Sequence, residues 1–351
     1  MNDKEQINDE IDNYKDTIYA MVGFMNFYRY DDTSKAMKDN VLVFQGRRLE
    51  PSPEKTINSN GEKIPHVTPD IGVLLPSKDG VLGEVKKSFP IEQELWIKTF
   101  EQLMSYDDDL MGWPSTDKKV NSHDIVLILH QSRTKAVRKF FEGHKGSKIN
   151  FNRPFCIIEF NRSDERKAYI FFRIEYGLLS DNSVNGKLGN GVQVPMDVFI
   201  EIYSTIKIYD SEPPLPYLIE LIWTNVVLRK ASEETKFEKL RKNQKIEVIL
   251  EIDNIIEELH QEFSFRSLYG DNHDRQPKIP KKEWVMRACE HLVKSNEATW
   301  IDSTKATVKV FFRKYDDILV HFIELCSEKE ENSNQLKLFG DKNNKGEYSP
   351  N

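Results

Sequence analysis

The residues best suited to chemistry lie between Pro69 and Lys86. Asp70 follows Pro69, and thirteen residues separate it from Glu84-Val85-Lys86. Two apolar runs, 67–75 and 81–86, flank the turn-forming residues 76–80 and predict a strand hairpin. An Asp at the start of one strand and a Glu within its partner bring two carboxylates to one end of a sheet. Such oxygen ligands suit Mg²⁺, which keeps several waters for a substrate phosphate.

Lys86 stands two positions after Glu84, so strand alternation turns both side chains to the same face. An ammonium group there can orient or help deprotonate an attacking water and stabilise negative charge in a phosphoryl transition state. The backbone carbonyl of Val85 is a further candidate metal ligand. We therefore expect a site for Mg²⁺, or Mn²⁺ in its place.

The elements that must position this site form an α/β pattern. Helical spacing of apolar residues predicts a helix within 1–40, and residues 41–44 form a short apolar run. In the hairpin turn, Asp79-Gly80 is expected to supply the positive φ. An amphipathic helix over 91–106, a strand buried on both faces over 125–130 and a basic helix over 134–143, ending at Gly143, follow. Residues 155–160 and 168–174 are two further strand candidates, and the Gly/Asn-rich segment 177–191 is expected to be a loop.

The second half of the chain has a mainly helical pattern. A proline-rich linker over 211–216 separates it from the α/β part. Helices are expected over 218–227, 246–263 and 281–293, with a β element over 306–312 and an apolar segment over 318–326. In outline this order resembles a winged-helix module. We expect an α/β domain over 1–210, a mostly helical domain over 217–326 and a polar tail over 327–351.

The motif around Glu84 resembles that of the PD-(D/E)XK nuclease superfamily, over roughly residues 40–176. Pro69-Asp70 and Glu84-Val85-Lys86 carry the likeness, and Gly83 precedes the acid as is frequent in that family. The resemblance implies a restriction-endonuclease-like mixed sheet flanked by helices. It also implies that Asp70 and Glu84 are metal ligands and that Lys86 is the catalytic lysine.

Two further features of the resemblance concern helices. Gln102 and Tyr106 have the Gln-x-x-x-Tyr spacing of the exonuclease branch and lie on one helical face. They could contact the metal-site carboxylates or the DNA backbone. The family often has an earlier acidic residue on its first helix, for which Glu50 is the first candidate and Glu10 the second.

The composition is globular, with 38% hydrophobic and 30% charged residues and a net charge of −7. An acidic total does not exclude a basic face, because residues 131–176 carry eleven Lys/Arg against five Asp/Glu. Arg133, Lys135, Arg138 and Lys139 are the candidate DNA-binding residues. The three cysteines have no zinc-ligand or disulfide spacing and are expected to be buried thiols.

The polar tail contains one apolar island, Gln335-Leu336-Lys337-Leu338-Phe339. It is similar to the pentapeptide that binds the bacterial sliding clamp. Leu336, Leu338 and Phe339 could enter an apolar pocket while Gln335 hydrogen-bonds at its rim. The alternative is a hydrophobic segment that packs back on the domain.

These features predict a Mg²⁺-dependent DNA endonuclease acting in restriction, anti-phage defence, mobile-element processing or repair. One alternative is an exonuclease that works with a helicase or polymerase, and another is a non-catalytic, clamp-associated DNA-binding regulator. A cytoplasmic location is expected, because the chain has no apolar run long enough for a membrane span and no signal-peptide pattern at its start. A homodimer is one option, since cutting both strands usually takes two sites.

Overall fold

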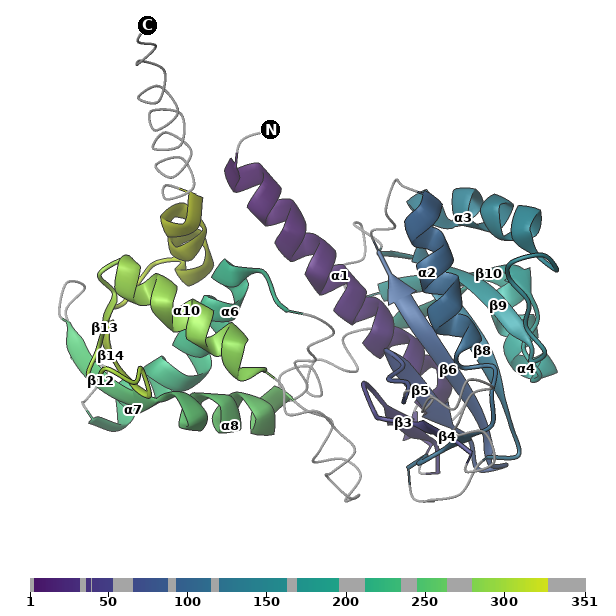
Figure 1. Cartoon of the computed structure of the whole chain (residues 1–351), viewed down its shortest axis with the longest axis horizontal. Coiled ribbons are helices and arrows are strands. Elements are labelled where there is room, and N and C mark those ends of the chain that lie inside the picture. Colours follow the sequence, from purple (N-terminus) through teal and green to yellow (C-terminus); the bar gives the residue numbers. More distant parts are fainter. Residues whose placement is uncertain are drawn as a thin grey trace, which may run out of the picture. The chain divides into compact units, whose positions relative to one another are not determined.

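A computed structural model describes residues 3–31, 36–38, 40–52, 66–87, 93–114, 120–162, 169–195, 212–234, 245–263 and 280–327. The chain divides into two compact units (Figure 1). We call Asn13–Asp210 with Glu262–Lys278 the sheet unit. Met1–Asp12, Ser211–Gln261 and Ile279–Asn351 form the helical unit, so the first residues of the chain group with its second half.

The sheet unit combines one long helix with a mixed α/β fold. Its described elements, including a first helix that begins in the helical unit, are α1 (Asp3–Arg29), β1 (Tyr30–Asp31), β2 (Ala36–Met37), β3 (Leu42–Phe44), β4 (Glu50–Pro51), β5 (Ile71–Leu74), β6 (Asp79–Lys86), α2 (Gln93–Met104), β7 (Leu110–Met111), β8 (Ser122–His130), α3 (Gln131–His144), β9 (Phe155–Arg162), β10 (Tyr169–Gly177), α4 (Asn182–Asn190) and β11 (Val192–Pro195).

Seven strands form the main sheet in the order β11-β10-β9-β8-β6-β5-β3. The central pairs β6–β8 and β8–β9 are parallel, and the other pairs are antiparallel. Parallel strands need a crossover connection, and α2 and α3 supply the two crossovers. Strand β8 lies between two parallel neighbours and is buried over almost its whole length, as its continuous apolar run predicts.

Helices cover both faces of this sheet (Figure 1). On one face, Ile125, Leu127 and Leu129 of β8 join an apolar core with Phe100 of α2 and Phe141 of α3. On the other face, α1 packs on β10, where the rings of Phe24 and Phe172 lie 5.7 Å apart. Alternate residues of each central strand therefore belong to different cores.

The hairpin β5–β6 forms where the sequence predicts it, with Ile71 opposite Gly83. The positive φ lies at Lys78 (φ 64°), so the expectation for Asp79-Gly80 is wrong. Gly80 is a strand residue paired with Leu74, and a Cβ there would lie 2.4 Å from Cη2 of Trp113. Close packing, rather than turn conformation, explains this glycine.

Two further local predictions differ from the structure. Gly143 lies inside α3, which continues to His144. The segment 177–191 is not a loop throughout, because it contains α4. The Asp181 carboxylate accepts hydrogen bonds from the N–H groups of Ser183 and Val184, and Gly191 ends the helix at φ 82°. Capping residues at both ends make a helix of a glycine-rich segment.

The helical unit contains a small sheet beside its helices. Its elements are α6 (Leu215–Ile222), the π turn η3 (Trp223–Val227), α7 (Leu228–Glu234), β12 (Ile246–Glu251), α8 (Ile252–Phe263), α10 (Lys282–Lys294), β13 (Ala298–Trp300), β14 (Thr307–Phe312) and a helical segment over 318–327. The three strands pair antiparallel in the order β12-β14-β13.

The prediction of one helix over 246–263 is wrong in its first third. Ile246, Val248 and Leu250 are buried and alternate with exposed residues, which is the period of a half-buried strand. Over so few residues, spacing at every second residue also fits part of a helical stripe. The helix begins only at Ile252.

All three cysteines are free and buried, as the sequence predicts. Among the described residues, no helix combines the length and apolar character needed to cross a membrane.

Candidate active site

The hairpin register places Asp70 beside Glu84. Asp70 stands directly before β5, and Glu84 lies in β6 next to Gly83, the partner of Ile71. Oδ2 of Asp70 accepts a hydrogen bond from the N–H of Val85 over 2.9 Å. The Asp70 side chain is therefore held against the strand that carries Glu84 and Lys86.

Lys86 lies between the two carboxylates. Its Nζ is 2.9 Å from Oε2 of Glu84 and 3.4 Å from Oδ2 of Asp70. Strand alternation accounts for the contact with Glu84, because Glu84 and Lys86 face the same side of β6. The Lys86 side chain is 30% exposed and that of Asp70 13%, so the site reaches solvent on the side of these two residues.

Tyr106 holds Glu84 from the other side. Its hydroxyl donates a hydrogen bond to Oε1 of Glu84 and accepts one from Nε2 of Gln102 over 3.3 Å. Tyr106 is completely buried, which excludes direct contact with a DNA backbone in this arrangement. Two contacts are expected from the sequence for the Gln-x-x-x-Tyr pair, with the site carboxylates or with the DNA backbone. In the structure Tyr106 hydrogen-bonds the Glu84 carboxylate, and Gln102 hydrogen-bonds Tyr106.

Burial dominates the electrostatics of Glu84. Its side chain is completely buried, and desolvation raises its pKa to about 8. The nearby Asp70 carboxylate raises the pKa further, whereas Lys86 and the Tyr106 hydroxyl lower it. Oε2 receives no hydrogen bond from any described residue, although Lys86 Nζ lies close to it. A second positive charge at this position would therefore stabilise the ionised carboxylate.

Three oxygen donors at this position could contribute to binding a divalent cation. Asp70 and Glu84 supply carboxylate oxygens, and the Val85 carbonyl lies in the chain between Glu84 and Lys86. No group of three or more His, Cys, Asp or Glu side chains with metal-binding geometry occurs among the described residues. An ion here would have to complete its shell with water or substrate oxygens, as Mg²⁺ commonly does.

Glu50, the first candidate for a further acidic ligand, is not brought to this site. It lies on β4 rather than on the first helix, and its carboxylate pairs with Arg48. Glu10 is on α1, but it is exposed and groups with the helical unit.

The acid that α1 does bring to this edge of the sheet is Asp16. It contacts Lys87, the neighbour of Lys86, at 2.5 Å and Arg162 at 3.1 Å. No apolar spacing identifies Asp16 in the sequence, because residues two positions apart in a helix, such as Tyr14 and Asp16, point to nearly opposite sides.

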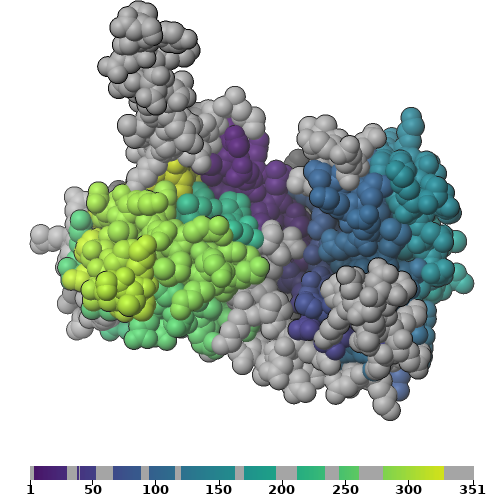
Figure 2. Space-filling view, viewed as in Figure 1, coloured from purple at the N-terminus to yellow at the C-terminus, as the bar shows by residue number. Residues whose placement is uncertain are grey.

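The four predicted DNA-binding cations all lie on α3, but not on one face. Lys135 and Lys139 are exposed and one helical turn apart, whereas Arg133 projects on the opposite side. Arg138 forms an ion pair with Glu142 at 2.9 Å and lies near Glu175. Helix α3 adjoins α2, as the contact between the rings of Trp96 and Phe140 and the space-filling view in Figure 2 show.

The clamp-binding-like residues Gln335, Leu336, Leu338 and Phe339 lie outside the described residues. The chain was also compared with family models, curated proteins and solved structures, and it matches none of them.

Proposed function

We propose that this protein is a Mg²⁺-dependent phosphodiester hydrolase that cuts DNA at the site formed by Asp70, Glu84 and Lys86. The observation that carries the proposal is the contact of one lysine with two carboxylates, one of them buried and raised in pKa to about 8. Perturbed titratable groups gathered in this way are typical of functional sites. A structural ion pair gains little from burying a carboxylate so deeply.

Each residue of the site has a role in this proposal. Asp70, Glu84 and the Val85 carbonyl would hold the ion, which supplies neutralisation of the scissile phosphate when bound. Lys86 Nζ orients the attacking water and donates hydrogen bonds to the negative charge that develops on the phosphate. Tyr106 acts as a positioning residue, because its hydroxyl fixes the Glu84 carboxylate, and Gln102 in turn fixes that hydroxyl.

The order of elements supports a restriction-endonuclease-like arrangement. A helix, the antiparallel strands β3, β5 and β6, the crossover helix α2 and the parallel strand β8 follow one another along the chain. The carboxylates lie on the hairpin, and Tyr106 comes from the end of the crossover. This arrangement supports the proposed likeness to PD-(D/E)XK nucleases.

We also propose a winged-helix-like role in recognition for the helical unit. Its order of helices and strands, with β14 central in the small sheet, supports the proposal. Three of the cations on or near α10 are paired with acids: Lys282 with Asp253, Arg287 with Glu212 and Lys305 with Glu290. Paired cations favour contact with a protein partner over binding of DNA phosphates.

Supercoiled plasmid and linear DNA incubated with Mg²⁺ test the catalytic proposal. We expect cutting by the wild type and a loss of about 100-fold or more in Asp70→Asn and Lys86→Met, as for removal of a group that stabilises a transition state. Lys98→Met and Glu101→Gln, exposed on α2, are matched controls that should cut normally. Cutting of linear ends alone would support the exonuclease. DNA binding without any cutting would overturn the enzyme and support the regulator.

A further inference from the structure

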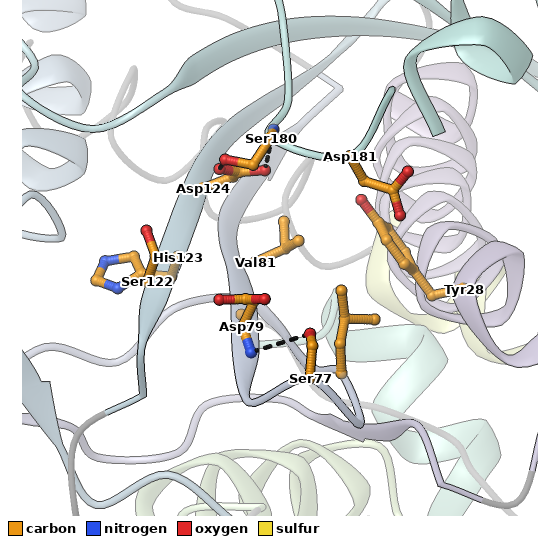
Figure 3. Close-up of a pocket in the computed structure, with 11 residues that line it drawn as sticks. Tyr28, Ser77, Asp79, Val81, Ser122, His123, Asp124, Ser180 and Asp181 are labelled. Carbon is orange, nitrogen blue, oxygen red and sulfur yellow. Dashed lines mark hydrogen bonds between the residues drawn. The ribbon is translucent and has the colours of Figure 1, made fainter. Parts of the chain in front are cut away.

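A polar cavity, separate from the candidate active site, lies at the opposite end of strand β6 from Glu84. It has a volume of about 260 Å³ and is bordered by the amino ends of β6 and β8, by α1 and by the start of α4 (Figure 3). Asp79 at its rim is five residues before Glu84, so the two sites are roughly 17 Å apart along the strand. Asp79 and Asp124 face the α1 side of the sheet, whereas Glu84 faces the α2 side.

The lining of this cavity is acidic. Asp79, Asp124 and Asp181 contribute carboxylates, and the lining residues include neither Lys nor Arg. His123 does not compensate, because burial lowers its pKa to about 4 and its Nε2 lies 2.6 Å from the backbone oxygen of Tyr106. Burial and the neighbouring Asp79 and Asp181 raise the pKa of Asp124. The cavity is therefore a region of negative potential at neutral pH.

Tyr28 adds an independent polar group to the cavity. This residue is only 5% exposed, and its ring is fixed between Phe24 and Phe27 of the same helix. Its hydroxyl borders the cavity beside Asp181 (Figure 3) and forms no hydrogen bond with any described residue. The hydroxyl faces the cavity, so its hydrogen-bond partner has to be a water molecule or a ligand there.

Some of the carboxylate oxygens that line the cavity already accept hydrogen bonds within the protein. Both oxygens of Asp124 accept hydrogen bonds from Ser180, over 2.6 and 2.7 Å. Oδ1 of Asp181 caps α4. The Asp79 carboxylate, Oδ2 of Asp181 and the Tyr28 hydroxyl have no hydrogen bond within the described part of the chain and are open to a ligand.

The spacing of the acidic groups in the cavity favours an organic cation over a metal ion. The three carboxylates do not form a metal-binding group within the described part of the chain, which argues against one metal ion shared by all of them. A ligand with several N–H donors can reach separated acceptors, and Leu75 and Val81 offer apolar surface for a short carbon chain. The volume is below that of pockets for drug-sized molecules.

We infer that this cavity binds a small organic cation, an alkylammonium or guanidinium compound, through Asp79, Asp181 and the hydroxyl of Tyr28. The ammonium or guanidinium group donates to the two carboxylates, and the Tyr28 hydroxyl accepts a further N–H. This binding site is independent of the proposed nuclease chemistry.

Isothermal titration of the full chain with 1,4-diaminobutane and agmatine tests the inference, with 1,4-butanediol as the uncharged probe. We expect a dissociation constant of about 1 mM or below for a diamine or guanidinium probe and none measurable for the diol. Asp79→Asn should weaken binding about tenfold or more. Asp253→Asn, a surface acid that does not line the cavity, should leave it unchanged.

Tyr28→Phe keeps the ring packing and removes only the hydroxyl, so it should weaken binding about threefold to tenfold. Should Tyr28→Phe fail to fold, Asp79→Asn alone tests the inference. Asp79 is not fully buried, so its substitution should not prevent folding. The inference is overturned if no probe binds at about 10 mM, if the diol binds equally well, or if Asp253→Asn weakens binding as much. It is also overturned if Mg²⁺ alone displaces the amine in the wild type.

Discussion

At the scale of single residues, burial of the Glu84 carboxyl group makes the stability of the fold depend on pH. Its carboxyl group is buried beside Asp70, and it has a pKa of about 8 against an ordinary value of 4.5. Between these two pH values the folded chain holds a proton that the unfolded chain has released. Stability from this residue is therefore present below about pH 4.5 and is lost as the pH rises toward 8.

Glu84→Gln should raise the melting temperature at neutral pH, because glutamine cannot ionise. The gain should increase from pH 5 to pH 8, with about 2–4 °C for each kcal/mol, and shrink when Mg²⁺ is added. Calorimetry across this pH range measures it. Glu101→Gln, an exposed acid on α2, is the matched control and should show no such trend. A gain that does not depend on pH would contradict the raised pKa of Glu84.

Tyr106→Phe tests whether the tyrosine hydroxyl tunes Glu84. The hydrogen bond from Tyr106 lowers the pKa of Glu84, so removing the hydroxyl should raise that pKa further. The acid limb of the pH–rate profile for DNA cutting should then move up by about one pH unit, the equivalent of about 1.4 kcal/mol. Tyr176→Phe, whose hydroxyl accepts from Lys145, should leave the profile in place. An equal loss of rate at every pH would mean that Tyr106 only supports packing.

At the scale of elements, close packing of the hairpin against β8 fixes the site. Gly83 lies opposite Val126 in the parallel pair, and a Cβ at Gly83 would lie 2.3 Å from Cγ2 and 2.8 Å from the backbone oxygen of Val126. The resemblance explains this glycine as a family feature. The structure gives the physical cause, since only glycine lets β6 approach β8 so closely.

Gly83→Ala should destabilise the sheet unit by about 1–3 kcal/mol, because the added methyl group overpacks this contact. Gly143→Ala is the matched substitution. It lies within α3 with no atom near its added Cβ, so it should stabilise the same unit by up to about 1 kcal/mol. Urea unfolding midpoints report both changes. Effects of the same sign would contradict the packing explanation.

At the scale of the whole molecule, the proposed catalytic site and the clamp-binding-like motif are far apart in the sequence. The proposed catalytic residues belong to the sheet unit, and Gln335–Phe339 follow the last described residue of the helical unit. If the motif serves recruitment alone, cutting and clamp binding should be separable by mutation.

Leu338→Ala with Phe339→Ala should reduce retention on an immobilised bacterial sliding clamp about tenfold or more and leave plasmid cutting unchanged. Lys337→Ala is the control, because it changes the variable position inside the motif. Retention that is equal in all three proteins would refute clamp recognition by this segment.

The sequence by itself determined the local parts of the site. Its periodicity predicted the hairpin and the buried strand β8, and strand alternation put Glu84 and Lys86 on one face. It did not separate the strand β12 from the helix α8, nor did it identify α4, because apolar spacing over a few residues fits more than one element. The capping by Asp181 and the pairing of β12 with β14 resolve these cases.

Only the tertiary structure decided which distant residues meet. Tyr106 closes on Glu84 from twenty-two residues away, Asp16 reaches Lys87, and Tyr28 completes a cavity with Asp79 and Asp124. These contacts depend on how α1 and α2 pack on opposite faces of the sheet. Spacing along the chain encodes which face a side chain takes, whereas the neighbour it meets across that face depends on the packing of whole elements.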